Sequence, residues 1–212
     1  MQALFSPDSK FMQILSRIAD LILLNILFLL TSLPIITVGA ASTALYTVCF
    51  QMIEDRESSI VKAYFQAFRE NFKQATILWL ILALCIASSA VNLLLFYYTE
   101  SVLRYICPIF AILLILAVLT FGYAFPLVSR FSNDTRSTLK NAIFLTIGHL
   151  PRSLFISLLN VFPLALFLLN LYVFFKTGIL WIILYFAAAA YVNALLLNKV
   201  FAPYLTAEEV SP

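Results

Sequence analysis

Long apolar runs separated by short polar intervals are the feature of this sequence that most limits its fold. Residues 18–52 contain Asp20 as their only charged residue, and residues 75–98 and 105–129 contain none. About 20 apolar residues suffice for a helix to cross a bilayer. The chain is 63% hydrophobic and 11% charged, whereas soluble domains have about 25% charged residues, so its charges are too few to cover a water-exposed surface. These runs predict an all-α, polytopic membrane helical bundle that forms a single integral membrane domain over residues 1–212.

The spacing of the runs predicts about six transmembrane helices. We expect them at approximately residues 18–33, 35–53, 75–98, 105–129, 153–175 and 179–197. Five spans are the alternative, because residues 18–53 are interrupted by Pro34 and Gly39, which disfavour continuous helix. These residues form either a hairpin of two short spans, or one span followed by a re-entrant or interfacial helix. The residues after the break, Val38-Gly39-Ala40, resemble a signal-peptidase site, but the run before them is long and polar at Asp20 and Asn25, so we expect an uncleaved first span.

Two polar intervals have helical periodicity and predict amphipathic helices in the cytosol, at residues 59–73 and 137–150. In the first, Ile60, Tyr64, Phe68 and Phe72 recur every fourth residue, while basic residues occupy other faces. The face of this helix contacts lipid, the bundle or a partner protein. Its candidate partner-docking residues are Tyr64, Phe65, Phe68, Arg69, Asn71 and Phe72.

The distribution of basic residues predicts the orientation. With six spans and a cytosolic N-terminus, eleven of the thirteen Lys and Arg residues face the cytosol, and only Arg104 and Lys176 lie outside. This asymmetry follows the positive-inside rule, whereas five spans would separate Lys10 and Arg17 from the basic intervals. We therefore expect both chain ends in the cytoplasm.

The inventory of reactive residues argues against an enzyme. The single histidine, His149, precludes a histidine-based metal site, and three cysteines in apolar runs fit neither a disulfide framework nor a zinc site. Phosphate-binding loops, dinucleotide fingerprints and nucleophile elbows are absent, so no catalytic residue, metal or cofactor is predicted. A net charge of +3 gives no indication of a nucleic-acid partner.

Polar groups inside the spans are the candidates for binding a ligand. Ionisable groups at membrane depth are functional candidates, although Asp20 also lies one turn from Arg17 and can pair with it. Asparagines at positions 25, 92, 160, 170 and 193 either join helices by hydrogen bonds or line a polar seam. A broken helix exposes backbone dipoles to a substrate in transporters, or is an ordinary turn. The ligand or polar-seam candidates are Asp20, Asn25, Pro34, Thr37, Gly39, Ser88 and Asn92.

Three segments resemble the YesL-like family of bacterial integral membrane proteins. They are Asp20-Leu-Ile-Leu-Leu-Asn25, Leu33-Pro-Ile-Ile-Thr-Val-Gly-Ala40 and Phe65-Gln-Ala-Phe-Arg-Glu-Asn-Phe-Lys73. The resemblance implies a multi-pass protein of the bacterial cell membrane whose function is uncharacterised. It also implies an association with carbohydrate ABC-transporter components, because members are often encoded beside them.

Two roles follow as expectations. The first is an accessory or partner component of a carbohydrate (ABC-type) uptake system, embedded in the lipid bilayer and contacting ABC-transporter components or a second copy of itself. The alternative is a small transporter in its own right, or a membrane scaffold or sensor without transport activity.

Overall fold

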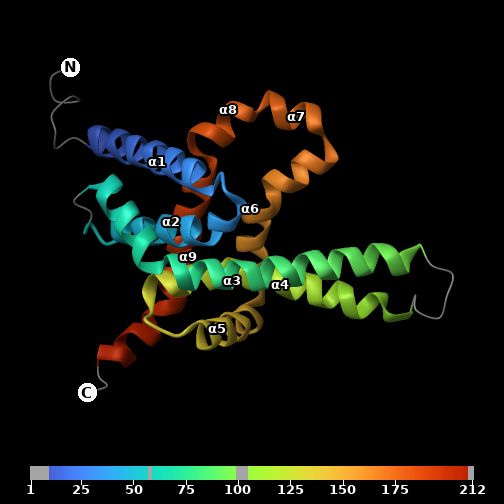
Figure 1. Cartoon of the computed structure of the whole chain (residues 1–212). Helices are drawn as coiled ribbons and strands as arrows, with labels where there is room; N and C mark the ends of the chain where they lie inside the picture. The colour runs from blue at the N-terminus through green and yellow to red at the C-terminus, as the bar shows by residue number, and fades with distance from the viewer. Residues whose placement is uncertain (1–9, 57–58, 99–104, 210–212) are drawn as a thin grey trace.

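The computed structural model describes residues 10–56, 59–98 and 105–209, and these residues form an all-α helical bundle (Figure 1). The predicted turn at residues 100–104, including Arg104, lies outside the described residues. The elements are α1 (Lys10–Ser32), the 3-10 turn η2 (Ile35–Thr37), α2 (Val38–Ile53), α3 (Ile60–Tyr97), α4 (Cys107–Arg130), α5 (Thr135–Gly148), α6 (Leu150–Leu169), α7 (Leu171–Lys176), α8 (Gly178–Leu180), the π-helical turn η4 (Trp181–Tyr185) and α9 (Phe186–Glu209).

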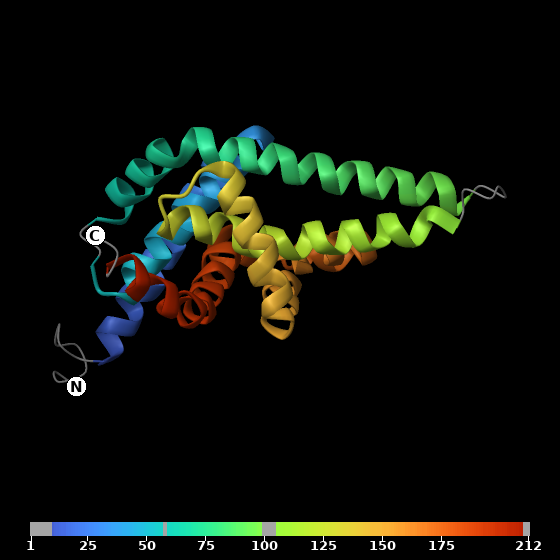
Figure 2. The same ribbon diagram turned by 90° about the horizontal axis from the view of Figure 1, so that it is seen from below.

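Six helical segments in this part of the chain are long and apolar enough to cross a membrane, which confirms the predicted fold class. They are Phe11–Ser32, Ile35–Ile53, Ile60–Tyr97, Cys107–Arg130, Leu150–Leu169 and Gly178–Leu205. The chain is therefore a multi-pass membrane protein. The first residue of α1 and the last turn of α9 lie at the same end of the molecule (Figures 1 and 2).

The predicted amphipathic helix at 59–73 and the predicted span at 75–98 are one continuous helix, α3. Residues 60–97 contain neither glycine nor proline, so the polar stretch around Lys73 does not interrupt the hydrogen-bond ladder. At 1.5 Å per residue this 38-residue helix is about 57 Å long, nearly twice the hydrocarbon thickness of about 30 Å. With α4 it forms a hairpin that projects from the rest of the molecule (Figures 1 and 2).

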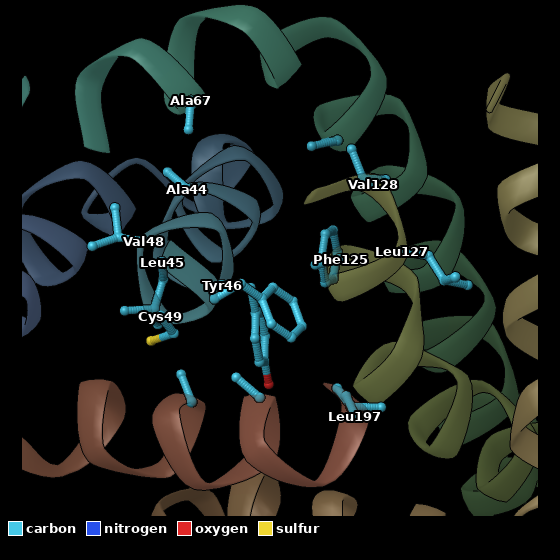
Figure 3. Packing of buried hydrophobic residues seen from close by; sticks show 14 of the residues in the cluster. Ala44, Leu45, Tyr46, Val48, Cys49, Ala67, Phe125, Leu127, Val128 and Leu197 are labelled. Atoms are coloured by element: carbon cyan, nitrogen blue, oxygen red, sulfur yellow. The ribbon is translucent and has the colours of Figure 1, made fainter. Parts of the chain in front are cut away.

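Helix α2 lies in the centre of the bundle and contacts α1, α3, α4 and α9. Its first two turns, Gly39-Ala-Ala-Ser-Thr-Ala44, are buried throughout. Small residues let neighbouring helices approach closely, which is the usual basis of helix packing in lipid. Figure 3 shows Ala67 of α3 facing Ala44 of α2, while Phe125 of α4 and Leu197 of α9 close the other sides of this core.

The tip of the α1–α2 hairpin lies beside α3. The Tyr64 hydroxyl is hydrogen-bonded to the Thr31 hydroxyl at 2.6 Å, and the Trp79 indole N–H donates to the Ile35 carbonyl at 2.7 Å. The expected topology put residues 34–39 outside and residues 59–73 in the cytosol, so the contacts of Thr31 with Tyr64 and of Ile35 with Trp79 bring the two sides closer than that assignment requires. Both helices of the hairpin, Phe11–Ser32 and Ile35–Ile53, remain among the six segments that are long and apolar enough to cross a membrane.

The C-terminal spans also differ from the expected ranges. The predicted span 153–175 begins earlier, at Leu150, and breaks at Asn170, whose side-chain oxygen accepts the Val173 N–H at 3.1 Å and so caps α7. The helical segment that contains predicted span 179–197 runs from Gly178 to Leu205. Its early turns include η4, where the backbone changes to π-helical bonding. The second amphipathic helix is α5, with Asp134 as its N-cap.

Candidate functional site

Asn25 joins α1 to the π-helical turn. Its amide nitrogen donates to the Trp181 and Ile182 carbonyls at 3.0 and 2.7 Å, and its amide oxygen accepts the Ala187 N–H at 2.9 Å. A π-turn shifts the backbone register, and groups left without partners are costly in lipid, where water cannot satisfy them. Asn25 is fully buried and supplies those partners. A ligand at Asn25, as predicted from the sequence, would have to compete with these bonds.

Side chains of the protein hydrogen-bond to the backbone carbonyls at the break between α1 and α2. The Thr37 hydroxyl lies 2.5 Å from the Thr31 carbonyl and 2.7 Å from the Pro34 carbonyl, and Trp79 holds the Ile35 carbonyl. These contacts occupy carbonyls that a broken helix would otherwise offer to a substrate. Pro34 itself is exposed. The geometry is that of a packed turn.

At Gly39, helix α2 packs tightly against α3. A Cβ atom at this position would lie 2.3 Å from the Ala75 carbonyl oxygen and 2.6 Å from Trp79 Cβ. Real Cβ atoms do not approach a backbone oxygen so closely, so a side chain here would push the two helices apart. Gly39 therefore serves helix packing directly.

In the predicted polar cluster of α3, Ser88 is exposed and Asn92 is half-buried. The Ser88 hydroxyl donates to the Cys85 carbonyl at 3.2 Å, and the Asn92 amide donates to the Ser88 carbonyl at 2.8 Å, so both side chains bond to their own helix. Ser89, one position on, is buried instead. The structure does not bring Ser88 or Asn92 together with Asn25.

Asp20 is half-buried in α1 and has an interaction partner. Arg17, one turn earlier, forms an ion pair with Asp55 in the turn after α2. Asp55 has φ of 52°, in the left-handed region that Asp and Asn tolerate better than most residues. The expected pair of Arg17 with Asp20 stays a prediction.

The structure gathers a different set of polar groups, buried or half-buried, on α2, α6 and α9. The Asn193 amide nitrogen lies 3.3 Å from the Tyr46 hydroxyl and 3.1 Å from the Asn160 amide oxygen. Asn193 is fully buried, and its amide oxygen has no hydrogen-bond partner among the residues that the structure describes. Tyr46 points from α2 toward α9 (Figure 3). Two of the five span asparagines thus meet here, and sequence reasoning missed Tyr46 because its position on the α9-facing side of α2 depends on tertiary packing.

A cavity of about 210 Å³ adjoins this polar cluster. Its polar lining comprises Ser42, Tyr46, Asn160 and Tyr185, and the remaining lining is apolar. Pockets for small molecules have volumes of about 300–1,000 Å³, so this cavity suits a few water molecules or a small polar group rather than a sugar.

The predicted docking residues divide between two sides of α3. Tyr64 is fully buried against the α1–α2 hairpin and is unavailable to a partner, which corrects its assignment as a docking residue. Phe68 and Asn71 are half-buried, and the Asn71 amide bonds to the Ala67 carbonyl of its own helix at 3.0 Å. Phe65 and Phe72 are each 40% exposed, and Arg69 is exposed beside them.

An ion network closes the bundle end that holds the turn after α2. The Glu54 carboxylate binds both Arg130 of α4 and Arg56 of the turn, while Arg130 also donates to the Asn198 side chain of α9 at 2.7 Å. The Arg130 guanidinium lies over the Phe50 ring, 4.6 Å from its centre. Burial opposes ionisation of Glu54, but the bonds from Arg130 and Arg56 outweigh it and hold the pKa of that carboxyl below its ordinary value of 4.5.

These features define a multi-pass α-helical membrane protein with a small, largely apolar cavity beside a polar cluster, an ion-paired end and an outward aromatic–basic face on α3. A family model described as "Protein of unknown function, DUF624" matches residues 21–93, which include Asn25, the hairpin break, α2 and that face. The chain is 27% identical over 167 residues to "Uncharacterized protein YteU" of Bacillus subtilis (strain 168), an alignment that covers 77% of this chain and 72% of that protein. No solved structure matches.

Proposed function

We propose that this protein is a non-enzymatic component of a membrane complex that binds a partner protein through the outward face of the first half of α3. We call this surface the α3 docking face and define it by Val61, Lys62, Phe65, Arg69 and Phe72, all of them exposed. The partner is a component of a carbohydrate ABC-type uptake system, and the chain is a YesL-like protein of a bacterial plasma membrane with both ends in the cytoplasm.

The observation that supports this proposal most is the contrast between the two sides of one helix. Tyr64 and Ala67 are buried and anchor this part of α3, whereas Phe65 and Phe72 are exposed next to the cation Arg69. Aromatic and arginine side chains dominate binding energy at protein interfaces. A helix held rigidly by its buried side loses little entropy when its other side is bound.

The choice of a carbohydrate system as the partner rests on the resemblance of residues 20–25, 33–40 and 65–73 to YesL-like proteins. The third of these segments, residues 65–73, supplies residues to both the α3 docking face and the buried side of α3 that anchors it. The cytoplasmic orientation rests on the excess of basic residues in the intervals assigned to that side.

The proposal is tested by copurification from a native membrane in which the full chain carries an affinity tag. The double variant Phe65→Ser, Arg69→Glu removes the aromatic anchor and reverses the charge of the docking face. Because interface hot spots contribute about 2 kcal/mol or more, we expect recovery of ABC-transporter subunits to fall at least about tenfold.

The matched control is Phe175→Ser, Lys176→Glu, which makes the same kinds of change on the exposed end of α7. Recovery of transporter subunits should be unchanged in this variant. Equal recovery from the wild type and from the α3 variant, at equal expression, would rule out the docking face as the partner site.

Transport by this chain alone is the second candidate, and the buried cluster of Tyr46, Asn160 and Asn193 favours it. The adjoining cavity is smaller than a sugar site, which is why we rank partner binding first. Sugar flux into liposomes that contain this chain as their sole protein would reverse the order.

A further inference from the structure

Two adjoining cavities open at the ion-paired end of the bundle, between α2, α3 and α4. One has a volume of about 400 Å³ and is lined by Phe50, Glu54, Arg130 and neighbouring residues. The other, of about 230 Å³, is lined by Lys62, Gln66, Glu70 and neighbouring residues. Thr47, Gln51 and Arg56 line both cavities, so the two form one crevice.

The charges that line this crevice do not balance. Glu54 is the carboxylate shared by Arg56 and Arg130, so one negative charge serves two guanidinium groups. Lys62 adds a third cation, and Glu70, which accepts a hydrogen bond from Gln66 at 2.9 Å, adds a second carboxylate. Three cations face two carboxylates, which leaves a positive excess in a partly enclosed space.

Two guanidinium groups in the crevice have N–H donors available to an anion. The Arg56 side chain is 68% exposed, so its guanidinium is accessible from the crevice mouth while it binds Glu54. Arg130 is 11% exposed, and its Nε has no hydrogen-bond partner in the part of the chain that the structure describes. A buried arginine N–H without a partner is costly, and an oxyanion bound nearby would reduce that cost.

We propose that this crevice binds a phosphate group, held by Arg56 and Lys62 with the amide of Gln51 as an additional donor. Arginine and lysine are the side chains that bind phosphate oxygens most strongly, and basic pockets between membrane helices bind anionic headgroups. The phosphate belongs either to an anionic membrane lipid or to a soluble phosphorylated molecule. This site goes beyond the proposed partner function: it shares Lys62 with the edge of the α3 docking face, and its other lining residues on α3 are on the side toward α2.

The experiment uses the full chain, purified in detergent. Native mass spectrometry measures retention of phosphatidylglycerol against zwitterionic phosphatidylcholine, and a thermal-shift titration measures binding of glycerol phosphate. The variant Arg56→Gln, Lys62→Gln removes two cations from the crevice. Each cation near anionic lipid contributes about 1 kcal/mol, so the variant should bind roughly 10- to 30-fold more weakly.

The control Arg136→Gln, Lys140→Gln makes the same change of charge on the exposed face of α5 and should leave binding within about twofold. A preference for phosphatidylglycerol without a glycerol phosphate shift identifies a lipid headgroup, and the reverse identifies a soluble ligand; both support the site. Equal losses in the two variants, or binding of neither probe, overturn it. Because Lys62 also belongs to the α3 docking face, the two proposals are separated by Phe65→Ser, Arg69→Glu, which leaves the crevice residues unchanged: it should lower partner recovery and keep phosphate binding.

Discussion

At the residue scale, single polar side chains hold irregular backbone together inside the membrane. Asn25 and Trp79 each bond to backbone carbonyls of another element, at the π-turn and at the hairpin tip respectively. In lipid no water is available to replace such bonds, which explains why polar side chains lie where the helices are irregular.

We therefore predict that Asn25→Leu destabilises the protein by about 1–2 kcal/mol, because three backbone groups of the Trp181–Ala187 region lose a partner. The measurement is reversible unfolding in mixed detergent and SDS micelles. Asn92→Leu is the control, since its amide bonds to its own helix, and it should change stability by less than about 0.5 kcal/mol. Equal effects of the two substitutions would show that the bridge to η4 contributes nothing.

At the element scale, the α1–α2 hairpin ends beside the middle of α3. Its tip contacts Trp79, about 9 Å along α3 from Lys73, at 1.5 Å per residue. Leu33, Ile35 and Ile36 at that tip are exposed and apolar. An apolar tip beside the apolar part of α3 fits a tip that lies within the hydrocarbon layer.

This geometry predicts that Ile35→Cys reacts slowly with a membrane-impermeant maleimide added to either side. The thiol would lie in lipid, where little thiolate forms. Tyr98→Cys, at the far end of α3, is the comparison and should react rapidly from one side. Both are made in a background that lacks Cys49, Cys85 and Cys107. Rapid labelling of Ile35→Cys from the side that labels Tyr98→Cys would establish a full-depth hairpin instead.

At the scale of the whole molecule, the packed core lies toward one end, and the outer halves of α3 and α4 project from it (Figure 2). Leu84, Leu95 and Ile112 in that projection are more than half exposed, which suits contact with lipid tails. The other end is closed by polar contacts instead, since Glu54, Arg130 and Asn198 connect α2, α4 and α9.

The ion network makes the stability of the whole bundle depend on pH. The pKa of Glu54 is lowered in the folded state, so its contribution is complete above about pH 4.5 and is lost as the pH falls through the folded-state pKa. We expect the free energy of unfolding to fall on acidification from pH 6 to pH 4 in the wild type, and to fall less in Glu54→Gln. Glu70→Gln, on the exposed face of α3, should behave like the wild type; a parallel decline in all three proteins would contradict this account.

The apolar runs alone predicted the fold class. Unpaired backbone N–H and C=O groups are costly in lipid, and a helix pairs these groups within its own segment, so such a chain forms a helical bundle. They also placed the six candidate membrane helices to within a few residues at most boundaries. The continuity of α3 was missed, since a polar stretch was taken as an interruption although it contains no helix-breaking residue.

Tertiary structure decided which polar groups meet. The helical period shows that Asn25, Asn160 and Asn193 lie within spans, but the rotation and crossing of each helix determine their neighbours. The rotation and crossing of the helices are set by close packing at small residues such as Gly39. This packing depends on distances of a few ångströms, which no local sequence pattern encodes. The pairing of Asn160 with Asn193, the bridge from Asn25 to η4 and the shared carboxylate of Glu54 therefore followed from the packing of α2 against its neighbours, whereas the membrane character followed from composition and run length.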